Sequence, residues 1–315
     1  MSVAIRAEHL RKVYPKSPPG VVALDDLSLE VRTGGIYGLI GRNGAGKTTF
    51  VRIAATQLEP TSGTTTVLGY DVQGQESDIR ARVACVPQES RPLYFLNVQE
   101  VVYLYLKLRG LDSTEARRRT RDVLEELSLV EYQKRSVSRL SGGLRRRVMC
   151  AMVLASDADV LFLDEPTTGL DPLARREVWE AIRRASRENR TIVLTTHYLD
   201  EAEALSTRLA LIEQGRVMLE GTPADLRARV RYPYRVTIQG SFPREELDPL
   251  GQVSAIEGGY LVFAREAEAR EIARRALERG VRLSMGPVSL EDIFLDVVGR
   301  SIETEGSTEE WEAAT

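Results

Sequence analysis

The sequence predicts an α/β fold with a mostly parallel core sheet, followed by a small α+β domain. Two nearly continuous apolar runs, "ADVLFLDEP" at 158–166 and "TIVLTTH" at 191–197, are typical of strands in a parallel sheet covered on both faces. A glycine-rich loop, "GRNGAGKT" at 41–48, lies between a short apolar strand and a helix. Near residue 228 the pattern changes to a βαββαβ order, which marks a second domain.

The first domain, expected over residues 1–228, contains two further kinds of segment beside the core strands. Residues 1–34 alternate as strands do, with the Pro/Gly turn "PKSPPG" between two runs, so we expect an antiparallel N-terminal β part. Apolar residues recur at helical spacing between residues 98 and 134. A helical subdomain is therefore expected at about 89–155.

The second domain, expected over residues 229–300, is predicted to be ferredoxin-like. Its predicted elements are the strand "YRVTIQG", the helix "PREELDPL", a hairpin about Gly258 and Gly259, the helix "EAEAREIARRALERG" and the strand "VRLSMG". A last helix is expected after Ser289, which is a suitable N-cap. The acidic stretch at 301–315 is expected to be disordered.

Composition narrows the function classes. The net charge of −3 argues against a dedicated nucleic-acid binder. Cys85 and Cys150 lie far apart and match no metal spacing, so we expect core thiols in a reducing compartment. The chain has no apolar run of about 18 residues, and its N-terminus lacks the apolar segment of a signal peptide. Work at a membrane would therefore need another chain to hold this one there.

The stretch "GRNGAGKT" fits the phosphate-loop pattern G-x-x-x-x-G-K-[ST] at every fixed position. Its glycines let consecutive backbone N–H groups turn inward around phosphates, and the following helix adds its positive end. Lys47 is expected to reach the β and γ phosphates, and the Thr48 hydroxyl to ligate Mg²⁺. The predicted nucleotide-binding residues here are Gly41, Asn43, Gly44, Ala45, Gly46, Lys47, Thr48 and Thr49.

Polar residues at two strand ends predict the hydrolytic chemistry. Ligands bind at the carboxyl ends of strands in such sheets, which places Asp164 and Glu165 beside the phosphate loop. We expect Asp164 to hold Mg²⁺ and Glu165 to orient or deprotonate the attacking water. His197 ends the second strand and could contact the γ-phosphate and that water. The alternative for His197 is a satisfied structural group.

Gln88 and the segment at 140–147 each have a structural interpretation as well as a functional one. Gln88 follows another strand and is a candidate weak Mg²⁺ ligand and sensor, or an ordinary loop amide. The stretch "LSGGLRRR" at 140–147 predicts a helix opened by Ser141, Gly142 and Gly143, which is either an anion site or a simple N-cap. The arginines at 145–147 are expected to form a solvated face that also favours phosphates.

Taken in order, the phosphate loop, Gln88, "LSGG", "VLFLDEP", "GLDP" and "TTH" resemble the ATP-binding subunits of ABC transporters, over about residues 1–225. The resemblance implies a P-loop NTPase fold and a head-to-tail dimer around two Mg-ATP, in which the "LSGG" loop grips the partner's γ-phosphate. It also implies that Tyr14 stacks on adenine, rather than being a core tyrosine. Asp171 would connect the two sites. Leu144 departs from the family's usual glutamine.

The segment "SLEDIFL" at 289–295 is similar to the end of ABC-2-type exporter ATPases, such as those for daunorubicin and doxorubicin resistance. The resemblance implies an ATPase with Lys47, Glu165 and His197 as catalytic residues. It further implies a separate transmembrane permease, a second ATP-binding subunit identical to the first, and a place on the cytoplasmic side of the membrane. The alternative is an ABC ATPase acting on ribosomes or DNA, which usually carries two cassettes or a coiled-coil insertion.

Overall fold

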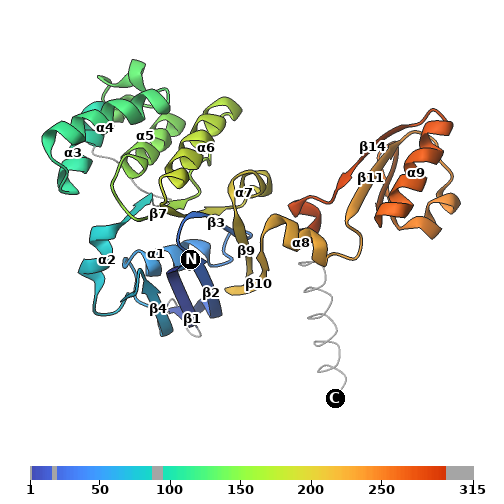
Figure 1. The fold of residues 1–315 in the computed structure, drawn as a ribbon, viewed down its shortest axis with the longest axis horizontal. Helices are drawn as coiled ribbons and strands as arrows, with labels where there is room; N and C mark the ends of the chain where they lie inside the picture. The colour runs from blue at the N-terminus through green and yellow to red at the C-terminus, as the bar shows by residue number, and fades with distance from the viewer. Residues whose placement is uncertain (1, 16–19, 87–94, 296–315) are drawn as a thin grey trace. The chain divides into compact units, whose positions relative to one another are not determined.

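The computed structural model describes residues 2–15, 20–86 and 95–295. These residues divide into two compact units, which lie within Met1–Glu220 and Gly221–Thr315 (Figure 1). The two units are described separately below.

A six-stranded sheet forms the centre of the first unit, in the order β10-β9-β3-β8-β7-β6. β6 pairs with β7, β7 with β8, β8 with β3, and β3 with β9, all in parallel. Every residue of β7 and β8 is buried. This arrangement confirms the parallel core predicted from the apolar runs. The strands are β3 (Gly35–Ile40), β6 (Val83–Val86), β7 (Val160–Asp164), β8 (Thr191–Thr196), β9 (Arg208–Glu213) and β10 (Arg216–Gly221).

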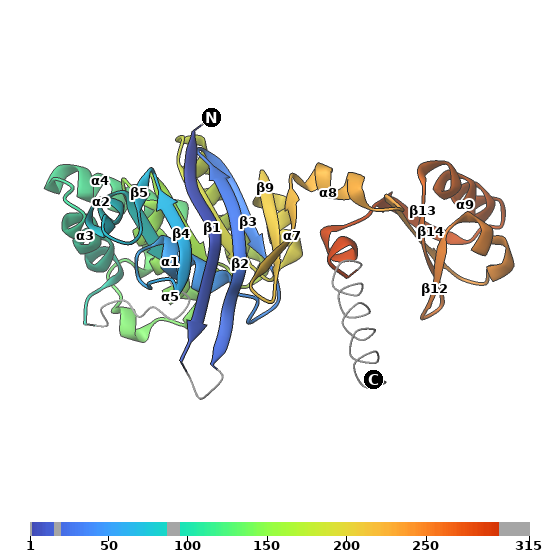
Figure 2. The ribbon, with the colours of Figure 1, turned by 90° about the horizontal axis from the view of Figure 1, so that it is seen from below.

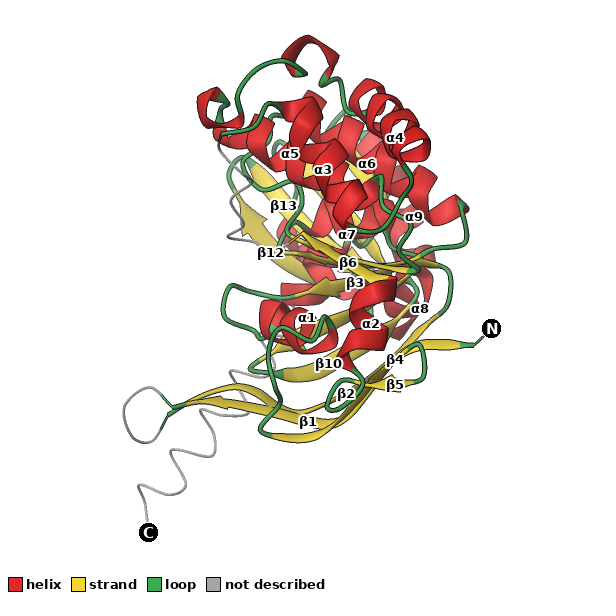
Figure 3. Cartoon of the chain, turned by 90° about the vertical axis from the view of Figure 1, so that its left-hand side faces the viewer, coloured by secondary structure: helices red, strands yellow, loops and turns green. Residues whose placement is uncertain are grey.

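The two faces of this sheet bury different layers, because successive strand residues point to opposite sides. Leu161 and Leu163 of β7 lie in the apolar cluster formed with the helices, whereas Val160 and Phe162 lie in the cluster on the other face. Figure 3 shows the helical layer above the sheet, with α1, α2 and the antiparallel strands below it. The sheet is therefore covered on both faces, as its continuous apolar strands require.

The N-terminal β part is a separate sheet in the order β2-β1-β4-β5, with antiparallel pairing throughout (Figure 2). Together with α1 and α2 it encloses the second apolar cluster. The elements are β1 (Val3–Tyr14), β2 (Val21–Arg32), α1 (Lys47–Ala54), β4 (Ser62–Val67), β5 (Tyr70–Asp71) and α2 (Glu76–Arg82).

The helical layer begins with two helices whose first turns are capped by side chains. Asn97 and Glu100 form a reciprocal capping box, and Asp112 accepts hydrogen bonds from two backbone N–H groups. The layer comprises α3 (Val98–Leu108), α4 (Ser113–Glu126), short 3₁₀ turns at Val130–Tyr132 and Val137–Arg139, α5 (Gly142–Leu154), α6 (Pro172–Arg187) and α7 (Leu199–Leu205).

The second unit contains a four-stranded antiparallel sheet in the order β12-β13-β11-β14, packed against α9. The expected helix at 243–250 is wrong: this segment forms two 3₁₀ turns, Arg244–Glu246 and Asp248–Leu250. Pro249 has no N–H to continue an α-helix, which explains the difference. The ferredoxin-like assignment stays a prediction. The elements are α8 (Pro223–Arg229), β11 (Tyr234–Gln239), β12 (Gln252–Ile256), β13 (Gly259–Ala264), α9 (Glu266–Glu278) and β14 (Arg282–Pro287).

A final helical stretch begins at Leu290 and is described as far as Leu295. The Ser289 hydroxyl accepts from the backbone N–H of Asp292 at 3.2 Å, and the Asp292 carboxylate accepts from the Ser289 N–H at 2.9 Å. This reciprocal pair confirms Ser289 as the N-cap. The predicted tail at 301–315 lies outside the described residues.

Both cysteines are reduced and packed into the first unit, Cys150 buried and Cys85 half-buried. Burial raises the pKa of the Cys150 thiol to about 11 and that of Cys85 to about 12, so neither is a thiolate at neutral pH. Within the described residues, every helix is too short or too polar to span a bilayer.

Phe162 offers a direct test of the core. It is fully buried in β7, so Phe162→Ala should destabilise the first unit by about 3–5 kcal/mol through lost burial and the cavity left behind. Urea unfolding followed by circular dichroism measures this. Phe95→Ala is the matched control, because Phe95 is 79% exposed. Equal unfolding midpoints for the two variants would contradict the core assignment.

Candidate active site

Three adjacent strands end at one edge of the core sheet and carry the predicted site residues. The glycine-rich loop follows β3, Asp164 ends β7, and His197 follows β8. Because β8 lies between β3 and β7 and all three run in parallel, their carboxyl ends lie side by side. The structure therefore brings together residues that are more than one hundred positions apart in the sequence.

The loop wraps closely around the Lys47 side chain, which is only 4% exposed. Its ammonium donates to the carbonyl oxygens of Gly41 at 2.8 Å and Arg42 at 3.0 Å. Burial lowers the pKa of Lys47, while the carboxylates of Glu165 and Asp164 act in the opposite direction. The net direction is a lowered pKa, because the effect of burial outweighs that of the neighbouring carboxylates.

Two glycines of the loop are required by the backbone. Gly46, which immediately precedes α1, has a φ of 109°, a conformation that favours glycine. At Gly41, a Cβ atom would lie 2.2 Å from the carbonyl oxygen of Ile212 on β9. The close packing of the loop against the sheet explains why these two positions carry no side chain.

Asp164 connects the loop to two strands. It is 1% exposed, and its Oδ1 accepts a hydrogen bond from the Thr48 hydroxyl at 3.2 Å and another from the Thr195 hydroxyl. A hydroxyl beside a carboxylate is a donor set that suits Mg²⁺. Among the described residues there is no cluster of three or more His, Cys, Asp or Glu able to hold a metal by itself.

Glu165 and His197 meet beside this carboxylate. Glu165 Oε1 lies 3.2 Å from His197 Nδ1, and the Thr168 hydroxyl donates to Glu165 Oε2 at 3.1 Å. The Glu165 N–H donates to both the carbonyl and the hydroxyl of Thr195, each at 3.1 Å. Glu165 also has a φ of 50°, unusual for a residue with a side chain, and such strain is concentrated at functional sites.

Arg146 of α5 supports the backbone beneath these acids. Its guanidinium donates to the carbonyl of Asp164 and to that of Glu165, the latter at 2.6 Å. Arg147 pairs with Glu177 at 2.7 Å and donates to the Leu127 carbonyl. The expected solvated face at 145–147 is therefore wrong for Arg146 and Arg147, whose guanidinium groups find carbonyl and carboxylate acceptors within the fold.

The "LSGG" segment lies at the start of α5. The Ser141 hydroxyl accepts from the Leu144 N–H at 3.2 Å, which is the N-cap contact. Ser141 and Gly142 are exposed, and a Cβ at Gly142 would meet no atom within 4 Å. Leu144 packs against the helical apolar cluster. Within one chain Ser141 therefore caps its helix and leaves the adjacent backbone open.

The remaining predicted residues lie at other edges of the site. Asp171 caps α6 by accepting from two backbone N–H groups at 3.0 Å each, and the bond from Ala174 in particular lowers its pKa. The Tyr14 hydroxyl lies 3.4 Å from the Thr49 hydroxyl, near the start of α1. Gln88 lies outside the described residues.

Comparison with known proteins decides the family. The ABC transporter family model matches residues 24–168. The Nod factor export ATP-binding protein I of Paraburkholderia xenovorans is 36% identical over 304 residues, covering 95% of this chain and 98% of that protein. The chain belongs to the ABC transporter family. The daunorubicin/doxorubicin resistance ATP-binding protein of Streptomyces peucetius is also 36% identical, covering 98% of this chain and 96% of that protein.

Solved structures agree with the ABC ATPase fold. An ATP-binding subunit of an ABC transporter aligns with a TM-score of 0.65 at 27% identity, covering 72% of this chain and 92% of that chain. A dimeric cassette bound to ADP and phosphate aligns at 0.64 and 23% identity, covering 69% and 98%, a likeness of fold alone. These relatives confirm the predicted fold class and the exporter-type resemblance. The chain is an ABC ATP-binding protein that hydrolyses ATP.

Arg146, Thr168 and Thr195 were missed by the sequence analysis. Thr195 lay within the quoted "TTH" motif, and Thr168 is two residues after the end of "DEP", so proximity along the chain could have suggested both. No comparable signal exists for Arg146, because its acceptors are backbone carbonyls on β7 and the turn after it.

Arg146 supplies the next prediction. Arg146→Ala should lower ATP turnover, because it leaves the Asp164 and Glu165 carbonyls without a charge-assisted donor, a loss of about 1.5–3 kcal/mol per bond. Steady-state ATPase assays on folded protein measure the effect. Arg270→Ala is the control, since Arg270 is exposed and pairs with Glu266 on its own helix. Unchanged turnover in Arg146→Ala would show that this backbone support is dispensable.

Proposed function

We propose that this ABC ATPase is the energy-coupling subunit of an ABC-2-type exporter, closing head to tail with a second copy around two Mg-ATP and driving a separate transmembrane permease. The observation that carries the proposal is the meeting of Glu165 and His197 beside the Thr48–Asp164 contact. The names of the Nod factor export and drug resistance relatives support export.

The phosphate loop has the parts needed to hold ATP. Lys47 offers a buried ammonium group, and the loop and α1 contribute backbone N–H groups toward phosphate oxygens, through Asn43, Gly44, Ala45, Gly46, Thr48 and Thr49. Tyr14 provides an aromatic ring for the adenine beside Thr49. Thr48 and Asp164 would hold Mg²⁺ with Gln88, and the ion would neutralise phosphate charge.

Hydrolysis is assigned to the pair at the ends of β7 and β8. Glu165 orients the attacking water or accepts a proton from it. Its side chain is only 7% exposed, so few other water molecules can reach the carboxylate. His197, 32% exposed, holds the γ-phosphate from the adjacent strand end. Thr168 and the backbone contacts to Thr195 keep Glu165 in place before substrate arrives.

The exposed "LSGG" backbone supports the dimer. Ser141, Gly142 and Gly143 begin a helix of 13 residues, whose free N–H groups suit a phosphate bound by another copy. Asp171 is the N-cap of a neighbouring helix, α6, and from there it could connect the two sites. Leu144 packs inward, so its replacement of the family's glutamine leaves the serine and glycines available.

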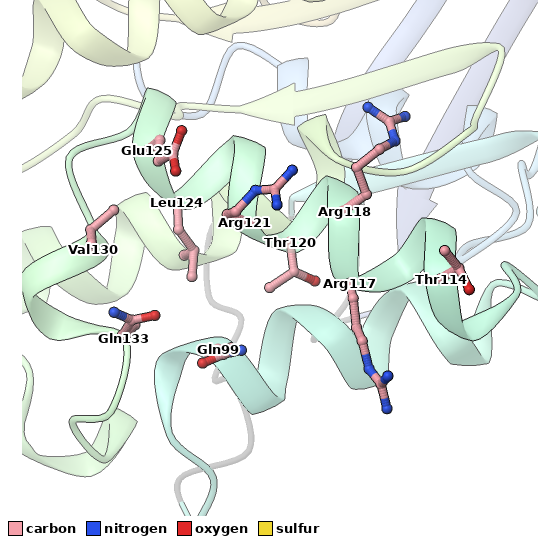
Figure 4. A pocket seen from close by; sticks show the side chains of 10 residues that line it. All are labelled: Gln99, Thr114, Arg117, Arg118, Thr120, Arg121, Leu124, Glu125, Val130 and Gln133. Carbon is pink, nitrogen blue, oxygen red and sulfur yellow. The ribbon is translucent and has the colours of Figure 1, made fainter.

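A groove in the helical layer is a suitable place for the permease. Its volume is about 720 Å³, and it runs between α3, α4 and the turn after them (Figure 4). Three arginines form its rim, two of them paired with acids on α4, while Leu124 and Val130 supply apolar surface. The full lining is Gln99, Thr114, Arg117, Arg118, Thr120, Arg121, Leu124, Glu125, Val130 and Gln133. An amphipathic permease segment with acidic residues would match it.

The decisive variant is Glu165→Gln. It should bind Mg-ATP with near-normal affinity and lose turnover by about 10²-fold or more, because proton acceptance is lost while phosphate contacts remain. Nucleotide titration and ATPase assays separate the two effects. Lys47→Ala should instead lose binding as well. Normal turnover in Glu165→Gln would remove Glu165 from its proposed role.

The same variant tests the dimer by sedimentation velocity. Glu165→Gln with Mg-ATP should sediment as a dimer and return to a monomer without nucleotide. Adding Ser141→Arg should prevent dimerisation, because a bulky cation would occupy the exposed phosphate-binding backbone. A persistent monomer with Mg-ATP would contradict a homodimer closed by nucleotide alone.

The groove gives a separate prediction for the permease. The double variant Arg117→Glu and Arg121→Glu should reduce co-purification with membranes of the producing cells, because it reverses the charge of the rim. ATP hydrolysis by the isolated protein should not change. Arg270→Glu in the other unit is the control. Equal membrane recovery for the two proteins would remove the groove as the docking site.

A further inference from the structure

Glu201 is a fully buried acid that none of the roles described above uses. It lies in the first turn of α7, four residues after His197, with 0% of its surface exposed. One carboxylate oxygen, Oε1, accepts hydrogen bonds from the Thr167 hydroxyl at 2.7 Å and the Trp179 indole N–H at 2.9 Å. Three elements distant in the sequence therefore meet at a single oxygen.

This acid is costly to bury. Removing a carboxylate from water costs several kcal/mol even after relaxation, and the donors that reach Oε1 are neutral. Burial raises the pKa of Glu201, while the hydrogen bonds from Thr167 and Trp179 oppose this shift. A well-packed apolar residue would generally stabilise such a position at least as well. Stability alone is therefore a poor explanation for an acid here.

Glu201 joins the turn after Glu165 to the helix after His197. Thr167, which donates to Glu201, is two residues after Glu165, and its neighbour Thr168 donates to Glu165 Oε2 at 3.1 Å. Glu201 itself is four residues after His197, in the first turn of α7. Trp179, the other donor, belongs to α6, whose N-cap is Asp171. A hydrogen bond therefore links the two segments that follow the groups proposed for hydrolysis.

We propose that Glu201 is a positioning residue for ATP hydrolysis, holding the turn after Glu165 against α7, the helix that follows His197. Its carboxylate acts through Thr167 and does not touch the substrate. The inference rests on the proposed roles of Glu165 and His197. The consequence is that the 3.2 Å approach of Glu165 Oε1 to His197 Nδ1 depends on an acceptor at position 201.

The geometry distinguishes the two obvious substitutions. Glu201→Gln keeps an amide oxygen that can accept from both Thr167 and Trp179. Glu201→Ala removes this acceptor and leaves the two donors buried without a partner. A positioning role therefore predicts rescue by glutamine, whereas a requirement for negative charge predicts none.

The experiment measures kcat and KM for Mg-ATP, together with nucleotide affinity, on full-length protein. Glu201→Ala should lower kcat by about tenfold or more with KM within about twofold, because small misplacements of catalytic groups are expensive while phosphate contacts persist. Glu201→Gln should restore kcat to within about threefold of wild type. Asp200→Asn, an exposed acid on the same helix, should match wild type.

Several outcomes would overturn the proposal. They are normal kcat in folded Glu201→Ala, an equal loss of kcat and nucleotide affinity, and a Glu201→Gln protein as impaired as Glu201→Ala. If Glu201→Ala fails to fold, Thr167→Val and Trp179→Phe each remove one donor and keep the shape. At least one of them should then lower kcat with KM unchanged, and normal kcat in both would reject the proposal.

Glu165→Gln and His197→Ala are assayed alongside to separate this inference from the proposed function. If both of those variants keep normal turnover, the proposed hydrolytic pair itself is wrong. If they lose turnover while Glu201→Ala does not, only the positioning role of Glu201 fails.

Discussion

The site depends on one buried carboxylate, Asp164. Its Oδ1 accepts from Thr48 at the start of α1 and from Thr195 on β8, so three consecutive segments of the sheet edge share one acceptor. The parallel pairing of β3, β8 and β7 places these groups within reach of one another. Because both faces of the sheet are covered, a ligand can reach its polar residues only at the carboxyl ends of the strands.

Side chains of two helices, α5 and α7, also bond the polar groups at this edge of the sheet. Arg146 donates to the carbonyls of Asp164 and Glu165. Glu201 accepts from Thr167, two residues after Glu165. The left-handed backbone at Glu165 lies between these two supports. Strained and buried polar groups persist where neighbouring contacts over-determine them, and here those contacts come from α5 and α7.

Several features of this sequence were predictable from local patterns. The continuous apolar runs predicted β7 and β8, the phosphate-loop spacing predicted the β3–α1 connection, and Ser289 predicted the start of the last helix. The segment at 243–250 was predicted as a helix, although Pro249 removes a donor that such a helix needs. Short-range rules succeed where one periodicity or cap decides the local structure.

The sequence by itself determined the parallel core, the phosphate loop and the identity of the acids at the strand ends. Only the tertiary structure decided that Arg146 donates to the backbone of Asp164 and Glu165, and that Glu201 accepts hydrogen bonds from Thr167 and Trp179. Periodicity tells which residues are buried, because burial follows one element's own geometry. It does not tell which buried polar groups meet, because a hydrogen bond depends on how separate elements pack together.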